Sequence, residues 1–143
     1  VGNISFSLDG DESSGTRKFF ALTGPILDVI ENGYTLVVDE LDSKLHPNLV
    51  CKIVSLFNSK EFNKKNAQLI FNTHDTNLLS SDLFRRDQIW FTEKDEFEAT
   101  DMYSLLEFKD EDGNTIRKDR SFEKDYIRGR YGAIPYISNF QEV

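Results

Sequence analysis

Two short apolar segments, each followed directly by polar side chains, constrain the fold of this 143-residue chain more than any other feature. Residues 34–39 read Tyr-Thr-Leu-Val-Val-Asp, and residues 68–73 read Gln-Leu-Ile-Phe-Asn-Thr. Nearly continuous apolar runs of this length, rich in β-branched residues, are typical of strands that are covered on both faces of a parallel sheet. We therefore expect two buried strands in these positions.

Helical patterns and further strands surround these two segments. Apolar residues recur at helical spacing after residues 13–16, in a helix that the Gly-Pro pair at 24–25 should bend. A second helix should begin at Pro47, since proline is favoured at the first helical position. Residues 88–92 predict a third strand, and residues 102–108 another strand near a sheet edge. This alternation predicts an α/β fold with a mainly parallel sheet flanked by helices.

Each of the two buried segments leads into polar residues. The first runs into Asp39 and Glu40, and the second into Thr73, His74 and Asp75. Ligands of open α/β sheets bind beyond the carboxyl ends of the strands, so these side chains could form a site for phosphate and metal. Two other interpretations stay open: the acids could cap the next helix, and His74 could be a hydrogen-bonded core histidine.

Residues 12–16, Glu-Ser-Ser-Gly-Thr, open the first predicted helix with hydroxyl side chains and a flexible glycine. Exposed backbone N–H groups and the helix dipole can bind an anion at such a position. Ser and Thr also cap helices routinely, so capping alone is the alternative interpretation.

The order and spacing of these motifs resemble the C-terminal half of an ABC/SMC-type ATPase core. A helix-opening Ser-Ser-Gly-Thr precedes a strand ending in Asp-Glu, then Leu-His-Pro at 45–47, and then a second strand ending in Thr-His-Asp. More closely, the chain resembles the ABC-like AAA-family ATPases of bacterial phage-resistance and abortive-infection systems, including relatives of the OLD-type nucleases. Residues 122–135 resemble the tail of those ATPases, so the resemblance covers nearly the whole chain.

The resemblance implies catalytic and metal-binding roles for three residues. Residues 36–39 match the Walker B strand of a P-loop NTPase, in which Asp39 would hold Mg²⁺. Glu40 matches the catalytic glutamate, and His74 matches the switch histidine.

The resemblance also implies nucleotide contacts from two other segments. Residues 12–16 match the signature motif and residues 43–46 the D-loop, and together they supply the expected ATP-binding residues Ser13, Ser14, Gly15, Thr16, Ser43 and His46. Transporters of this class have Leu-Ser-Gly-Gly-Gln in the signature and Leu-Asp in the D-loop. Here Ser14 replaces the first of those glycines, Thr16 replaces the glutamine, and the D-loop ends in Leu-His. These variants suit the SMC and defence branch, so we do not expect transport.

No phosphate-binding loop of the form Gly-x-x-x-x-Gly-Lys-[Ser/Thr] occurs, because none of the eight glycines precedes a lysine. We therefore expect the chain to be the C-terminal part of a longer ATPase whose loop lies upstream, and the initial valine agrees. Residues 1–116 would belong to the ATPase core and residues 117–143 to a basic, aromatic tail that packs on or extends it. On its own, the chain should be inactive.

In ATPases of this class, two cores sandwich two nucleotides. The resemblance thus implies a homodimer in which Asp39, Glu40 and His74 of one subunit face Ser14 and Gly15 of the other, with ATP and Mg²⁺ between them. The rest of the chain could bind an effector protein or DNA, in a phage-defence or DNA-transaction system.

Composition excludes several classes of protein. A net charge of −8 argues against a protein that coats nucleic acid, and one cysteine excludes a disulfide framework or a multi-cysteine zinc site. Apolar runs are too short to span a membrane and no signal peptide is evident, so we expect a cytoplasmic protein without a membrane partner.

The charge is uneven along the chain. Residues 1–116 contain 11 basic and 21 acidic side chains, whereas residues 117–130 contain six basic and three acidic ones. The basic tail either pairs with the acidic body or forms a docking surface for an effector or nucleic acid.

Two other functions remain open at this point. One is a metal-dependent nuclease or phosphatase that uses Asp39, Glu40, His74 and Asp75 directly as ligands. The other is a non-catalytic module that binds a nucleotide or a partner.

Overall fold

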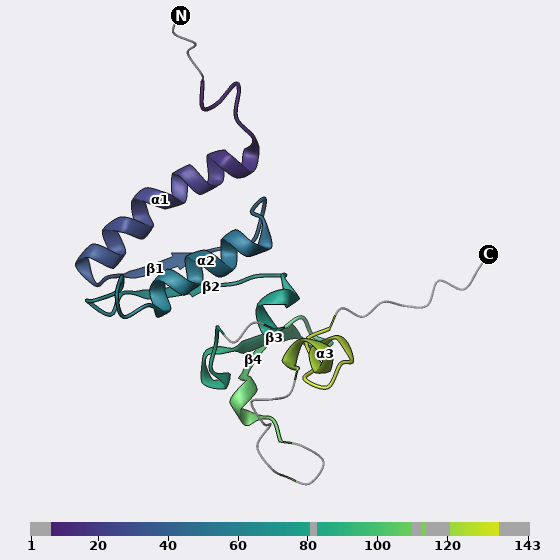
Figure 1. Cartoon of the computed structure of the whole chain (residues 1–143). Coiled ribbons are helices and arrows are strands. Elements are labelled where there is room, and N and C mark those ends of the chain that lie inside the picture. The colour runs from purple at the N-terminus through teal and green to yellow at the C-terminus, as the bar shows by residue number, and fades with distance from the viewer. Residues whose placement is uncertain (1–6, 81–82, 110–112, 114–120, 135–143) are drawn as a thin grey trace, which may run out of the picture. The chain divides into compact units, whose positions relative to one another are not determined.

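The computed structural model of the chain describes residues 7–80, 83–109, 113 and 121–134 (Figure 1). The chain divides into two compact units, Val1–Thr76 and Asn77–Val143, and each is considered separately. The predicted boundary between core and tail, at residues 116 and 117, lies outside the described residues and stays a prediction.

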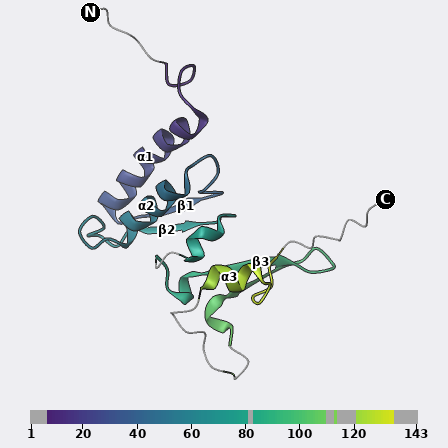
Figure 2. The same cartoon turned by 45° about the vertical axis from the view of Figure 1, so that its right-hand side comes forward.

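The first unit is built on a βαβ motif. It contains helix α1 (Ser14–Asn32), strand β1 (Thr35–Val38), helix α2 (Pro47–Asn58) and strand β2 (Gln68–Phe71) (Figures 1 and 2). β1 and β2 pair in parallel, and α2 connects them. The prediction of two parallel strands around a helix that begins at Pro47 is therefore confirmed.

Local sequence explains where α1 begins and ends. Ser13 is the N-cap, and Gly33 ends the helix in the left-handed conformation, with its N–H donating to the Val29 carbonyl. The Gly24-Pro25 pair lies within α1 and does not end it. None of the helices in the described part of the chain is long and apolar enough to cross a membrane.

The core of this unit lies on one face of the β1–β2 pair. Leu36 and Leu69 pack there against buried side chains of both helices and of the segment before β2, namely Ile26, Val29, Ile53, Phe57 and Ala67. On the opposite face, Val37 and Ile70 are directly paired in the register and are 71% and 56% exposed. The expectation that both faces are covered is therefore wrong for the described residues, because α1 and α2 pack on the same face.

A buried asparagine ties the end of α2 to the beginning of β2. The Asn63 amide donates to the carbonyls of Phe57 (2.7 Å) and Ala67 (2.8 Å), and its oxygen accepts from the Ala67 N–H at 2.7 Å. The side chain thus replaces backbone hydrogen bonds where the chain turns, and it fixes the residue that leads into β2.

Substituting Asn63 by Ala should destabilise this unit by about 1–3 kcal/mol, because the buried backbone groups of Phe57 and Ala67 lose their partners. The free energy of unfolding from chemical denaturation measures the effect. Asn48→Ala, at an exposed position near the start of α2, is the control and should change stability little. Equal effects of the two substitutions would contradict this role for Asn63.

The second unit contains a separate, antiparallel pair of strands. β3 (Trp90–Lys94) and β4 (Thr100–Ser104) form a hairpin whose turn is closed by Asp95. The Asp95 carboxylate accepts from the backbone N–H groups of Phe97 and Ala99, both at 2.8 Å. The expectation that the third strand joins the parallel sheet is therefore wrong for the described residues, where β3 pairs only with β4. The short connection between these two strands can only join them in antiparallel orientation.

Short 3₁₀ turns complete this unit. Between β2 and β3 the described residues form η1 (Thr76–Ser80) and η2 (Arg86–Gln88). After β4, the predicted strand at 102–108 gives way to η3 (Leu105–Glu107), which Ser104 caps.

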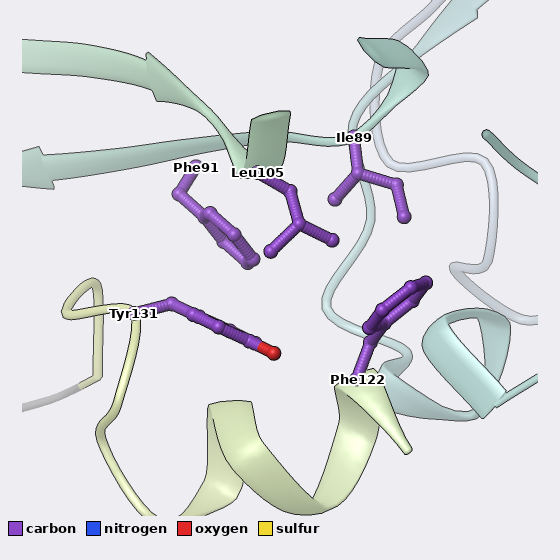
Figure 3. Close-up of a cluster of buried hydrophobic side chains, with 5 residues drawn as sticks. All are labelled: Ile89, Phe91, Leu105, Phe122 and Tyr131. Carbon is purple, nitrogen blue, oxygen red and sulfur yellow. The ribbon is translucent and has the colours of Figure 1, made fainter. Parts of the chain in front are cut away.

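An aromatic core joins the hairpin to the C-terminal helix α3 (Phe122–Ile127). Figure 3 shows its buried side chains pointing toward one another, namely Ile89, Phe91, Leu105, Phe122 and Tyr131. The Phe91 ring lies 5.5 Å from each of the rings of Tyr126 and Tyr131.

In the described part of the basic tail, Arg130 pairs with Asp125 at 3.4 Å. The tail residues Arg117, Lys118 and Arg120 lie outside the described residues.

Tyr103 connects β4 to the glycine-containing loop after α3. Its hydroxyl donates to the Tyr131 carbonyl at 2.8 Å, and burial, followed by the nearby Glu93 carboxylate, raises the pKa of Tyr103 to about 12. Gly132 has a φ of 69°, and a Cβ there would lie 2.6 Å from the Tyr103 hydroxyl. Only glycine fits this close approach without displacement.

Candidate functional site

The parallel register brings the two polar strand ends to one edge of the sheet. Val38 lies opposite Phe71 at the last pair of the ladder, so Asp39 and Asn72 leave the sheet at the same edge. Asp39, Glu40 and His74 are all exposed to solvent there. The predicted assembly of these three residues at a common edge agrees with this geometry, and their chemical roles stay predictions.

Asn72, which was not recognised from the sequence, connects the two strand ends. Its side-chain amide donates to Asp39 Oδ1 at 2.7 Å, and its side-chain oxygen accepts from the backbone N–H of Glu40. Its own backbone carbonyl accepts from the N–H of Leu41 at 3.2 Å. Because Leu41 is fully buried, these contacts attach the exposed acids to the core.

The backbone of Glu40 is held in a conformation that few residues other than glycine adopt. Its φ is 48°, and such positions persist where the surrounding structure compensates the strain. The Glu40 N–H donates to the Asn72 side chain. The Glu40 carbonyl accepts from Lys18 Nζ and, at 3.1 Å, from the Ser43 N–H. Both backbone groups are therefore bonded, and the carboxylate is exposed at the sheet edge. The Lys18 contact was not predicted either.

Helix α1 opens with a side-chain cap. Ser13 Oγ accepts from the Thr16 N–H at 3.1 Å and lies 3.0 Å from Thr16 Oγ1, so the capping interpretation is confirmed for Ser13. Ser14 is the first helical residue and is exposed. Binding of an anion at this helix end stays a prediction.

The start of α1 packs against the loop that follows Glu40. A Cβ on Gly15 would lie 2.6 Å from the carbonyl oxygen of Lys44, so a larger residue has no room there. The segments predicted to be the signature motif and the D-loop are thus in contact within one chain. At the end of the same loop, His46 Nδ1 accepts from the Asn48 N–H at 3.2 Å, which makes His46 the N-cap of α2.

Gly15→Ala should lower stability by about 1–3 kcal/mol, because the added methyl group forces α1 and the Lys44 loop apart. Gly24→Ala is a matched control in the same helix, since no atom lies within 4 Å of the Cβ position. This control should stabilise the protein by up to about 1 kcal/mol through helix propensity. Thermal or chemical unfolding measures both; a Gly15 variant as stable as the Gly24 variant would contradict the contact.

His74 is not a core histidine. Its side chain is exposed, which overturns the interpretation of a buried, hydrogen-bonded imidazole. It lies between Thr73, whose Oγ1 accepts from the Asp75 N–H at 3.0 Å, and the partly buried Asp75. An exposed imidazole at a strand end is available to a ligand.

The acids at this edge suit a magnesium ion that retains most of its water. Asp39 offers a hard oxygen ligand on an exposed side chain, and Mg²⁺ typically binds one or two carboxylates together with substrate phosphates. In the described residues, no three His, Cys, Asp or Glu side chains form a metal-binding cluster. The alternative of a nuclease with several direct protein ligands therefore has no supporting geometry in that part of the chain.

A nearby carboxylate oxygen has an unusual environment. Oδ1 of Asp42, in the loop between β1 and α2, is buried and accepts no hydrogen bond from the described residues. Burying such an atom without a hydrogen-bond donor costs free energy. A donor from outside these residues would therefore bind favourably to this oxygen.

Comparison with known families identifies the first unit. Residues 4–80, more than half of the chain, match the family described as "AAA domain, putative AbiEii toxin, Type IV TA system". Comparison with curated proteins gives no match. Comparison with solved structures gives none either. The matched segment includes the whole βαβ motif and every predicted site residue. The chain therefore belongs to this family of AAA domains, whose members are nucleotide-binding domains of the P-loop NTPase class.

Proposed function

We propose that this chain binds and hydrolyses ATP as the C-terminal part of an ABC/SMC-like ATPase. The observation that carries the proposal is the common edge of β1 and β2, where Asp39 and Glu40 follow one strand and His74 follows the other. Membership of an AAA family supports nucleotide as the ligand. The phosphate-binding loop would be supplied by residues outside these 143.

The proposed chemistry depends on positioned charge. Phosphoryl transfer needs little covalent participation from the protein, so orientation and electrostatic stabilisation provide most of the catalysis. Glu40 would orient the attacking water and accept its proton, and His74 would hold the γ-phosphate and the water in line. Asp39 would hold Mg²⁺ through water, and the ion would neutralise charge on the phosphates.

A second copy of the chain would complete each site. We propose a homodimer in which Ser14 and Gly15 of one copy contact the γ-phosphate bound by the other, with Ser13, Thr16, Ser43 and His46 nearby. The exposed start of α1 supports this role, because a helix N-terminus favours phosphate. We also propose a place in a phage-defence or DNA-transaction system, with an effector protein or DNA as the further partner; the matched family's description names a toxin of a Type IV TA system.

Glu40→Gln in the full-length protein should abolish ATP turnover and retain bound ATP, because the amide cannot accept the proton from water. A general base contributes about 10²–10⁴-fold to the rate. Turnover is measured by phosphate release, and trapping of a dimer by light scattering with ATP present. Glu31→Gln, at an exposed position in α1, is the control. Unchanged hydrolysis in the Glu40 variant would reject the assignment.

His74→Ala should slow hydrolysis by about tenfold or more, as expected for a group that acts in the transition state. The thermal unfolding midpoint should stay the same, because the imidazole is exposed. Both are measured on the full-length protein. If turnover is indifferent to this substitution, His74 has no part in the reaction.

A further inference from the structure

We propose that Asn72 is a positioning residue that holds the metal-binding carboxylate of Asp39 and the backbone of Glu40 in one fixed arrangement. This inference rests on the proposed function. It assigns a role to a residue that neither the sequence motifs nor the family match singles out.

The geometry of an amide explains why asparagine suits this position. The Asn72 side chain donates to Asp39 Oδ1 at 2.7 Å and accepts from the Glu40 N–H, and both polar atoms lie in one rigid plane. Two hydrogen bonds from one plane fix the Asp39 carboxylate relative to the Glu40 peptide. A carboxylate, a hydroxyl or an aliphatic side chain of similar size cannot make both bonds in this way.

The Asn72 hydrogen bonds also lie directly beyond the end of the β1–β2 ladder. β1 and β2 pair only as far as Val38 and Phe71, and beyond them the chain turns at Glu40 with a φ of 48°. Two hydrogen bonds to Asn72 connect the two segments at this turn. The Asn72 side chain accepts from the Glu40 N–H, and the Asn72 backbone carbonyl accepts from the Leu41 N–H at 3.2 Å. Strain at Glu40 is thus compensated by the residue that directly follows β2, on the segment that leads to His74.

Solvent exposure distinguishes this role from ordinary packing. Asn72, Asp39 and Glu40 are all exposed, so their hydrogen bonds bury little surface. Hydrogen bonds between exposed groups contribute little to folding because water competes for the same groups, whereas partners that orient metal-binding groups typically matter about 10–100-fold for affinity or activity. The expected consequence of losing Asn72 is therefore a loss of rate with little loss of stability.

Two substitutions separate the two hydrogen bonds. Asn72→Ala removes both, whereas Asn72→Asp keeps an acceptor for the Glu40 N–H, removes the donor to Asp39 and places a like charge beside the Asp39 carboxylate. Asn32→Ala is the matched control: this exposed asparagine in α1 also donates its amide to a carboxylate, Asp28 Oδ1, at 3.0 Å.

The experiment uses the full-length protein and measures three quantities for each variant. These are kcat and KM for ATP at saturating Mg²⁺, the thermal unfolding midpoint, and amide hydrogen exchange at Glu40 without nucleotide or metal. Asn72→Ala should lower kcat by about 10–100-fold, leave KM within about threefold, and speed exchange at Glu40. Asn72→Asp should lower kcat as well but keep the Glu40 amide protected. Asn32→Ala should match the wild type in all three.

The outcomes distinguish this inference from the proposed function. Wild-type turnover in Asn72→Ala, with Glu40→Gln inactive, overturns the inference and leaves the ATPase assignment in place. Turnover that does not depend on Glu40 overturns the proposed function and this inference with it. Unchanged hydrogen exchange at the Glu40 amide in Asn72→Ala overturns the positioning role of Asn72. A fall in the unfolding midpoint that accounts for the lost rate overturns it as well.

Discussion

The parallel hydrogen-bonded register between β1 and β2 determines where every candidate residue of this chain lies. Because both strands run in the same direction and end together at Val38 and Phe71, the residues that follow them must leave the sheet at one edge. As a result, the adjacent acids Asp39 and Glu40 are brought to the same edge as His74, which is distant from them in the sequence. Helix α2, which begins at Pro47, connects the two strands, and the buried Asn63 amide ties the end of this helix to the residue before β2.

The same pair of strands is only half covered. Leu36 and Leu69 face the helices, whereas Val37 and Ile70 face solvent, and a sheet of two strands is rarely stable without further packing. In the proposed longer ATPase, additional strands and helices would cover this face. The apolar character of the strands on both sides, which led to the expectation of complete burial, is consistent with that larger core.

Local patterns were sufficient to predict the βαβ motif, and through its topology the shared edge of the site. These patterns did not predict the partner of β3, because an apolar run does not show which strand it pairs with. The tight turn at Asp95 places β4 antiparallel beside β3. The contacts of Asn72 and Lys18 with Glu40 could not be predicted either. They depend on the path of a turn whose φ of 48° at a glutamate has no signature in the residue types.

Capping and anion binding at the start of α1 are compatible rather than alternative. The Ser13 hydroxyl satisfies the N–H of Thr16, which is one of the four N–H groups that a helix leaves without an intrahelical partner. The cap therefore leaves the first-turn groups of Ser14 and Gly15 to other acceptors and also fixes their direction. Gly15 adds a steric limit, because the Lys44 carbonyl closes one side of the turn. A phosphate would have to approach from the exposed side of Ser14, away from that loop.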